Sequence, residues 1–185
     1  MKSYASPFAF IVIVLFFPSC ATVKLSGDEQ DALKVLQRYL ALDRNGARAD
    51  GTRDAAMAAL TTWNDEQDWE DFFVYSQHVI SRPQLESDKV KIRVRYDVDG
   101  VMRGTEYNPL DTETSESTEF ILISTADGWK IESPTIPPHV GFSAARKYAN
   151  EIGATNAAQV LSDAEYIAKL KGARAGHCNC ERLDF

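Results

Sequence analysis

Positive charge is scarce in this sequence of 185 residues. It holds 20 lysines and arginines against 27 aspartates and glutamates, a formal net charge of −7. A nucleic-acid binder needs a clustered basic field to neutralise phosphates, so we expect no nucleic-acid partner. Charged residues at 25% and aromatic residues at 10% are ordinary proportions, which argues against global disorder.

Several familiar signatures are also missing. The sequence shows no internal repeat, no glycine-rich phosphate loop, no serine elbow and no zinc-protease motif. It has one long apolar run, Phe8–Phe17. A helix needs about 20 apolar residues to cross a bilayer, so this shorter run is typical of an export signal, with Lys2 as the positive charge before it. We expect residues 1–19 to be a signal peptide.

Cysteine is rare as well, and the three present are Cys20, Cys178 and Cys180. The apolar run ends in Phe17-Pro18-Ser19-Cys20-Ala21, which resembles the lipobox of bacterial lipoproteins. The resemblance implies that Cys20 becomes the acylated N-terminus and holds the protein on the membrane. With Ala21 next to it, the implied location is the periplasmic face of the outer membrane in a Gram-negative cell. The open alternative is a plain secretory signal cleaved near the same place.

Helix signals follow a short tether, residues 20–25. Ser26-Gly27-Asp28-Glu29 is a capping box, in which the serine hydroxyl and the glutamate carboxylate each accept from the other residue's backbone N–H. Leucines at helical spacing continue from there to Asn45-Gly46, which is a suitable stop. A second short helix is predicted over residues 53–62.

The pattern then changes to that of an antiparallel sheet. A strand is predicted over residues 72–80, and apolar and charged residues alternate over 89–99, which predicts a strand with one buried face. Asp99-Gly100 predicts a hairpin turn, because both central positions of a type I′ turn need a positive φ. The remaining expectations are a return strand over 101–107, a loop over 108–117, and two strands over 118–124 and 129–133.

Two further helices are predicted near the C-terminus, over residues 143–151 and 156–171. We therefore divide the mature chain into a main domain over 26–138 and a C-terminal helical extension over 139–172. A short, polar, loose tail over 173–185 completes it.

Helices followed by an antiparallel meander make an α+β pattern. The closing hairpin Asp127–Ile131 (Asp-Gly-Trp-Lys-Ile) together with this pattern resembles the NTF2-like (cystatin-like cone) superfamily, in which many bacterial lipoproteins end their sheet in this way. The resemblance implies N-terminal helices packed on a curved antiparallel sheet, with the C-terminal helices as an addition. It implies fold more than function, since the superfamily includes isomerases, dehydratases, polyketide cyclases and domains without known chemistry.

An enzyme of this superfamily would hold an acid–base pair in the hollow of the sheet. His78 is the candidate general base, since histidine titrates near neutrality. Tyr39, Asp43, Tyr96 and Trp129 complete the candidate pocket. The competing interpretation is that the two tyrosines and Trp129 fill the core and that His78 is a core or edge histidine. No recognised catalytic spacing links these positions.

Three other features carry candidate chemistry. His139 follows two prolines and is a second candidate base. His177-Cys178-Asn179-Cys180 packs soft ligands together but lacks the spacing of a zinc site, so no metal is expected. The 89–99 strand also carries a basic ladder, which consists of Lys89, Lys91, Arg93 and Arg95. It could contact anionic lipid. The favoured interpretation is a solvated face that pairs across strands with acids such as Glu116 or Glu119.

The sequence thus predicts an exported, lipid-anchored envelope protein whose domain binds a small apolar ligand or an envelope protein, without a cofactor. Two alternatives stay open at this point. One is an isomerase, dehydratase or hydrolase with its active site in the hollow. The other is a structural protein that forms a homodimer through its curved sheet.

Overall fold

The computed structural model describes residues 24–49, 55–63, 69–174 and 182–184. The helices are α1 (Gly27–Arg44), α2 (Ala55–Ala58), α3 (Phe142–Glu151) and α4 (Thr155–Arg174). The strands are β1 (Asp71–Ser81), β2 (Gln84–Glu86), β3 (Lys89–Arg103), β4 (Glu106–Thr125), β5 (Gly128–Ser133), β6 (His139–Gly141) and β7 (Arg182–Asp184).

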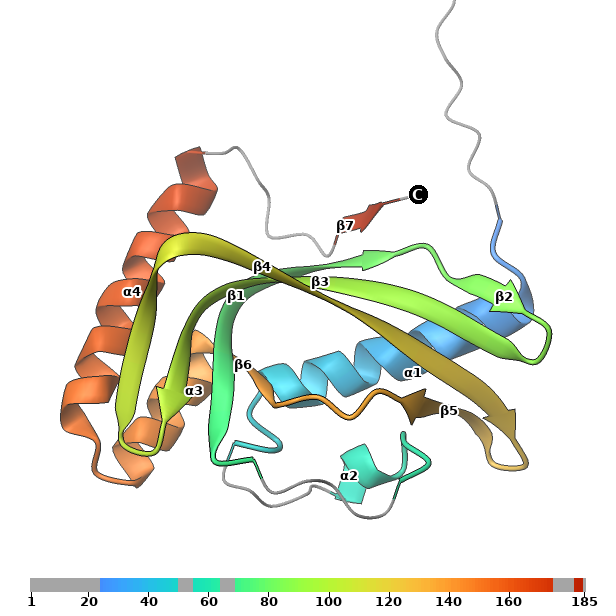
Figure 1. Ribbon diagram of the computed structural model, residues 1–185, viewed down its shortest axis with the longest axis horizontal. Coiled ribbons are helices and arrows are strands. Elements are labelled where there is room, and N and C mark those ends of the chain that lie inside the picture. Colours follow the sequence, from blue (N-terminus) through green and yellow to red (C-terminus); the bar gives the residue numbers. More distant parts are fainter. Residues whose placement is uncertain (1–23, 50–54, 64–68, 175–181, 185) are drawn as a thin grey trace, which may run out of the picture.

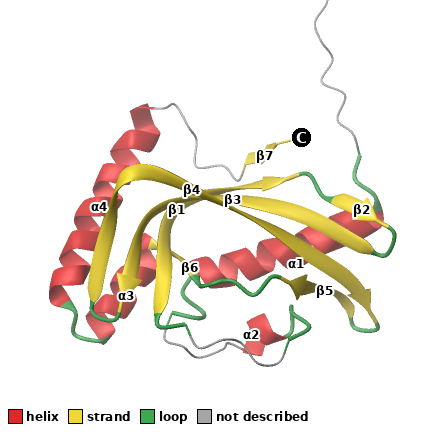
Figure 2. Cartoon of the chain, in the orientation of Figure 1, coloured by secondary structure: helices red, strands yellow, loops and turns green. Residues whose placement is uncertain are grey.

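The described strands form one curled sheet in the order β5-β4-β3-β1-β6, with β2 beside β3 and β7 beside β1. Only β6 and β7 run parallel to their neighbour. α1 lies in the hollow of the sheet, while α3 and α4 cover one end of its outer side (Figures 1 and 2). The predicted α+β class, with N-terminal helices on a curved sheet and additional C-terminal helices, is confirmed, and the arrangement agrees with the NTF2-like one.

α1 begins and ends where the sequence predicts. The Ser26 Oγ accepts from the Glu29 N–H at 3.2 Å, and the Glu29 carboxylate accepts from the Ser26 N–H at 2.7 Å. These bonds satisfy backbone donors that the first turn of a helix leaves open. The helix ends at Asn45, followed by Gly46 with a φ of 83°. Its buried face consists of Ala32, Leu33, Leu36, Tyr39, Leu40 and Asp43.

The predicted hairpin turn at Asp99-Gly100 is wrong. β3 continues through it to Arg103, and the chain reverses at Gly104, whose φ is 53°. Gly100 lies at a register shift between β3 and β4, and a Cβ placed on it would be 2.5 Å from the ring of Tyr107. The glycine is required because an aromatic ring covers it, and no positive φ is involved.

The predicted loop over residues 108–117 is also wrong. This segment belongs to β4, which pairs with β3 from Arg103 and Glu106 to Lys89 and Ile123. Most of its side chains are exposed, so it shows neither the apolar run nor the alternation by which a strand is recognised. β-branched threonines and pairing with β3 hold it extended instead.

Two smaller elements complete the wall of the hollow. The predicted helix over 53–62 is shorter in the described residues, where α2 covers Ala55–Ala58 and Thr61 then bridges to Ile131 of β5. The predicted hairpin around 126–128 is confirmed, with Gly128 at a φ of 106° and β5 paired to the end of β4.

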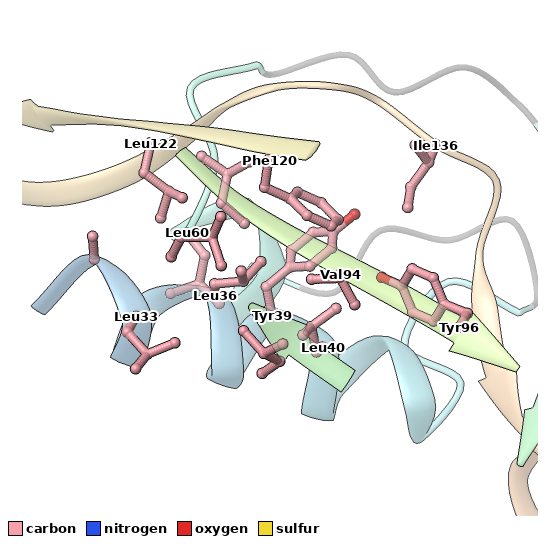
Figure 3. Close-up of a cluster of buried hydrophobic side chains, with 14 of the residues drawn as sticks. Leu33, Leu36, Tyr39, Leu40, Leu60, Val94, Tyr96, Phe120, Leu122 and Ile136 are labelled. Carbon is pink, nitrogen blue, oxygen red and sulfur yellow. The ribbon is translucent and has the colours of Figure 1, made fainter. Parts of the chain in front are cut away.

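The sheet carries a hydrophobic cluster on each face, and the two meet where the β1–β3 register shifts. Phe72 and Val74 of β1 pack with α3 and α4, whereas Tyr75 and Ile80 pack with α1. Two shifts lie at this point: β3 has an extra residue, Asp99, between the partners of Val74 and Tyr75, and β1 has one, Ser76, between Tyr75 and Gln77. Such bulges change which side chains face inward. Figure 3 shows side chains of α1, β3 and β4 meeting in the hollow.

Candidate functional site

Four of the five predicted pocket residues lie together at one end of the hollow. Tyr39 and Asp43 are one turn apart on α1, His78 comes from β1 and Tyr96 from β3, and each is at least nine-tenths buried. The rings of His78 and Tyr96 are 6.2 Å apart. Trp129 takes a different place: it lies on β5, half-buried against the apolar core.

Asp43 forms a buried ion pair with Arg48, which the sequence analysis did not select. The guanidinium donates from Nε and Nη2 to the two carboxylate oxygens at 3.0 and 2.7 Å, and from Nη1 to the carbonyl of Ile136 at 2.9 Å. Gly46 turns the chain back after α1 and so brings Arg48 beside the helix. The sequence did contain a signal for this pair: Arg48 has the opposite charge to Asp43 and follows it by five residues, just after the helix stop at Asn45-Gly46.

His139 lies on the other side of Asp43. Its backbone N–H donates to the Asp43 carboxylate at 3.0 Å, and its ring stacks on Tyr96 with centroids 4.1 Å apart. The ring Nδ1 is 2.8 Å from the Pro137 carbonyl, which can only accept, so Nδ1 carries a proton. Nε2 then faces the Glu116 carboxylate at 3.6 Å. Contact with the His139 ring lowers the pKa of Glu116, against the opposing effect of burial.

His78 is a weak base in this setting. Burial, and to a lesser degree the charge of Arg44, lowers the pKa of His78 to about 4. Its Nδ1 is 3.4 Å from the Tyr75 hydroxyl, and its Nε2 has no hydrogen-bond partner among the described residues. Burial also raises the pKa of Tyr96, so its phenol stays protonated. The cluster therefore holds the neutral imidazole of His78 next to the protonated phenol of Tyr96 at neutral pH.

Apolar side chains fill the hollow around this cluster. Tyr39, Tyr96 and Phe120 are each no more than 1% exposed, and the rings of Tyr39 and Phe120 meet edge to face at 5.9 Å. Figure 3 shows them together with Leu36 and Ile136 between α1 and the sheet. A substrate would have to displace these side chains to occupy this part of the hollow.

An open groove lies elsewhere, between the outer face of the sheet and the helices α3 and α4. Its volume is about 1030 Å³, at the upper end of the roughly 300–1,000 Å³ that small-molecule sites commonly enclose. The sheet contributes residues of β1, β3 and β4 from Tyr75 to Ser115, and the end of α1 contributes Arg44 and Asn45. The wall opposite comes from α3 around Phe142 and from the last turns of α4.

The basic ladder on β3 is paired with acids. Lys89 contacts Glu132 at 2.7 Å, and Lys91 contacts Glu86 at 2.6 Å. Arg93 contacts Glu119 at 3.4 Å, as predicted, whereas Glu116 turns to His139 instead. Arg95 lies 3.8 Å from Asp97 of the same strand. The interpretation as a solvated face paired across strands is confirmed for Arg93.

Some predicted residues lie outside the described ranges, namely Cys20, His177, Cys178 and Cys180. Within those ranges, no group of three histidine, cysteine or acidic side chains is placed to hold a metal ion. The described helices also include none long and apolar enough to cross a membrane. In comparisons with known proteins, no family model, no curated protein and no solved structure matches the chain.

Proposed function

We propose that the chain is an exported, lipid-anchored envelope protein of the NTF2-like kind, and that its domain binds a small ligand or a partner without catalysis. The observation that supports binding over catalysis is the contrast between the two faces of the sheet. The hollow holds the candidate catalytic residues but is filled, whereas the groove on the outer face is open. Ligand sites are generally concave and largely preformed, which favours the groove.

The anchor is supported by the N-terminal sequence. Five residues separate Cys20 from Ser26, where α1 is capped, and such a segment reaches at most about 20 Å when extended. A lipid on Cys20 would therefore hold the folded domain close to the membrane surface. Mass spectrometry of the membrane fraction tests this: we expect a mature chain that begins at Cys20, with a diacylglycerol on its sulfur and an acyl chain on its amine. An unmodified Cys20 contradicts the anchor.

A cone-pocket isomerase, dehydratase or hydrolase remains the second candidate. The arrangement in its favour is His139, whose Nε2 faces Glu116 next to the Tyr96 ring. A buried imidazole beside a carboxylate is a common acid–base pair. This candidate requires an opening to the hollow, so labelling of His139 by diethyl pyrocarbonate in the native protein would support it. Full protection of that ring at neutral pH supports the binding proposal.

Native mass spectrometry of the protein from its own host tests the binding proposal directly. We expect a mass above that of the mature, lipidated chain, from a retained small molecule or a partner protein. A doubled mass would instead support the homodimer. The bare mature mass in every preparation, even without washing, would contradict binding.

A further inference from the structure

The groove on the outer face is positive although the protein as a whole is negative. The whole chain has a formal net charge of −7. Five cationic and three acidic residues line the groove. The cations are Arg44, Arg95, Lys147, Lys169 and Lys171, and the acids are Asp97, Asp99 and Glu165. A cleft lined mainly by one sign of charge raises the local concentration of ligands of the opposite sign.

Partners within the protein already offset two of the three acidic side chains. Asp97 accepts from the Gln77 amide, and Arg95 lies close to it. Glu165 contacts Lys169 at 2.8 Å and Arg146 at 2.9 Å, and these cations lower its pKa. Burial raises the pKa of Asp99, against the opposing effects of Ser76 and Lys171. Asp97 and Glu165 therefore present little free negative charge to a ligand.

Arg44 differs from the other cations because the fold holds it in place without an acidic partner. Its Nη2 donates to the backbone carbonyl of Ser76 at 3.0 Å, and its guanidinium lies 5.2 Å from the centroid of the Tyr75 ring. Gly141 makes room for it, since a Cβ there would be 3.1 Å from the Arg44 Cγ. Among the described residues, no carboxylate oxygen lies within 4.0 Å of the guanidinium.

Arg44 therefore presents free donors in a fixed position. A guanidinium has five N–H donors in a planar fork that matches carboxylate and phosphate oxygens, and the Ser76 carbonyl accounts for one of them. Apolar groups of Val98, Phe142 and Ala168 line the groove as well. The site thus combines apolar surface with a cation that has no acidic partner among the described residues.

We propose that the groove binds a small organic anion, with its carboxylate or phosphate on Arg44 and its apolar body against Val98, Phe142 and Ala168. This rests on the proposed ligand-binding function and adds the chemical class of the ligand. It also changes the expectation of a purely apolar ligand, because an uncharged molecule would provide no anionic partner for Arg44.

Three probes with the same aromatic body test the proposal: naphthalene-2-carboxylate, 2-naphthyl phosphate and the neutral naphthalene-2-methanol. The full chain is used as its host processes it, in phosphatidylcholine nanodiscs when it carries a lipid, with empty nanodiscs as the blank. Titration calorimetry is expected to show at least one anion binding about tenfold or more tightly than the alcohol. The better of the two anions distinguishes a carboxylate ligand from a phosphate ligand.

Two variants in the groove, R44Q and K147Q, locate the anion, and R103Q is the control. R44Q is expected to weaken binding of the preferred anion about tenfold and to leave binding of the alcohol unchanged. R103Q removes an arginine that pairs with Asp71 away from the groove, and it should bind like the wild type. K147Q, at an exposed groove lysine, gives a second reading with little risk to folding, and a smaller loss of anion affinity is expected.

Three results would overturn the proposal. Equal affinity for the alcohol and both anions would show that the groove binds ligands but not by their charge, so the proposed binding function would survive and the anion class would fall. No binding of either anion at millimolar concentrations, or unchanged anion affinity in R44Q, would also remove the anion class, and native mass spectrometry would then decide the binding function separately.

Discussion

One buried carboxylate, Asp43, connects three parts of the chain. It ends the buried face of α1, pairs with Arg48 after the helix stop and accepts from the backbone N–H of His139 at the start of β6. Buried charges persist in proteins only when paired and hydrogen-bonded. We interpret Asp43 first as a structural residue that fixes the end of the hollow.

Removal of Asp43 is expected to destabilise the fold strongly. D43A leaves the Arg48 guanidinium buried without its partner, which costs about 3–5 kcal/mol of unfolding free energy. The matched control is D31A, because Asp31 forms an exposed pair with Lys34 on the same helix, worth about 0.5 kcal/mol. Urea unfolding measures both, and equal losses in the two variants would contradict the structural role.

Gly100 gives a second prediction at the scale of one residue. In G100A the new methyl group would overlap the Tyr107 ring, which is expected to cost about 1–3 kcal/mol through displaced packing. Gly27 is the control, since a Cβ there meets nothing within 4 Å. G27A should leave the urea midpoint unchanged or raise it. A G100A midpoint equal to that of the wild type would refute the close contact.

His78 makes stability depend on pH. The imidazole has a pKa of about 4 in the folded protein and 6.5 as the ordinary value, so the unfolded chain binds the extra proton first. Stability is therefore full above about pH 6.5 and falls as the pH drops toward 4. Between pH 7 and pH 5 the loss from this group amounts to roughly 2 kcal/mol.

Comparison with H78F isolates this effect, because phenylalanine keeps an aromatic ring at this position but cannot bind a proton. Unfolding free energies of both proteins at pH 7 and pH 5 provide the measurement. The wild type should lose about 2 kcal/mol more than the variant over this range. If both proteins lose the same amount, His78 is either accessible to water or already charged in the fold.

The sequence predicted part of this cluster, and the limit has a physical cause. Tyr39 and Asp43 share a helix face and Tyr96 lies on the buried face of an alternating strand, so spacing alone placed them inside. Arg48 was not selected and Glu116 was assigned to the basic ladder, because their places in the cluster depend on tertiary structure. A turn after α1 redirects Arg48, and Glu116 reaches the hollow through its pairing opposite Tyr96.

At the scale of elements, β3 and β4 show what local patterns leave open. Asp-Gly favours a turn, but in this chain the glycine accommodates a ring and the strand continues. The polar segment 108–117 looks like a loop because most of its side chains are exposed, and its extended form comes from pairing with β3. α1, by contrast, carried its capping and stop signals within its own residues and was predicted correctly.

α3 and α4 pack on the sheet through their own apolar cluster, which allows a test. Leu161 of α4 is fully buried in that cluster. L161A is expected to lose about 2–5 kcal/mol of unfolding free energy for the whole domain. Its neighbour Val160 is 39% exposed, so V160A should change stability by less than about 0.5 kcal/mol. Should both variants unfold like the wild type, the helices would be independent of the sheet.

At the scale of the whole molecule, the two faces of the sheet differ in role. The inner face and α1 form a closed core in which the predicted catalytic candidates are held rigidly. The outer face, with α3, α4 and the end of α1, leaves a positive groove. The sequence pointed to the hollow, since resemblance to cone folds draws attention there, whereas the groove arises from helices that the resemblance does not cover.

A crystal structure of the protein grown with the molecule that it retains from its own host tests the central claim most directly. The account predicts density for a small molecule in the groove, with an acidic group against Arg44, and an unchanged aromatic cluster around Tyr96. Density inside the hollow, with Tyr39 and Tyr96 displaced, would contradict the account and restore the hollow as the functional site.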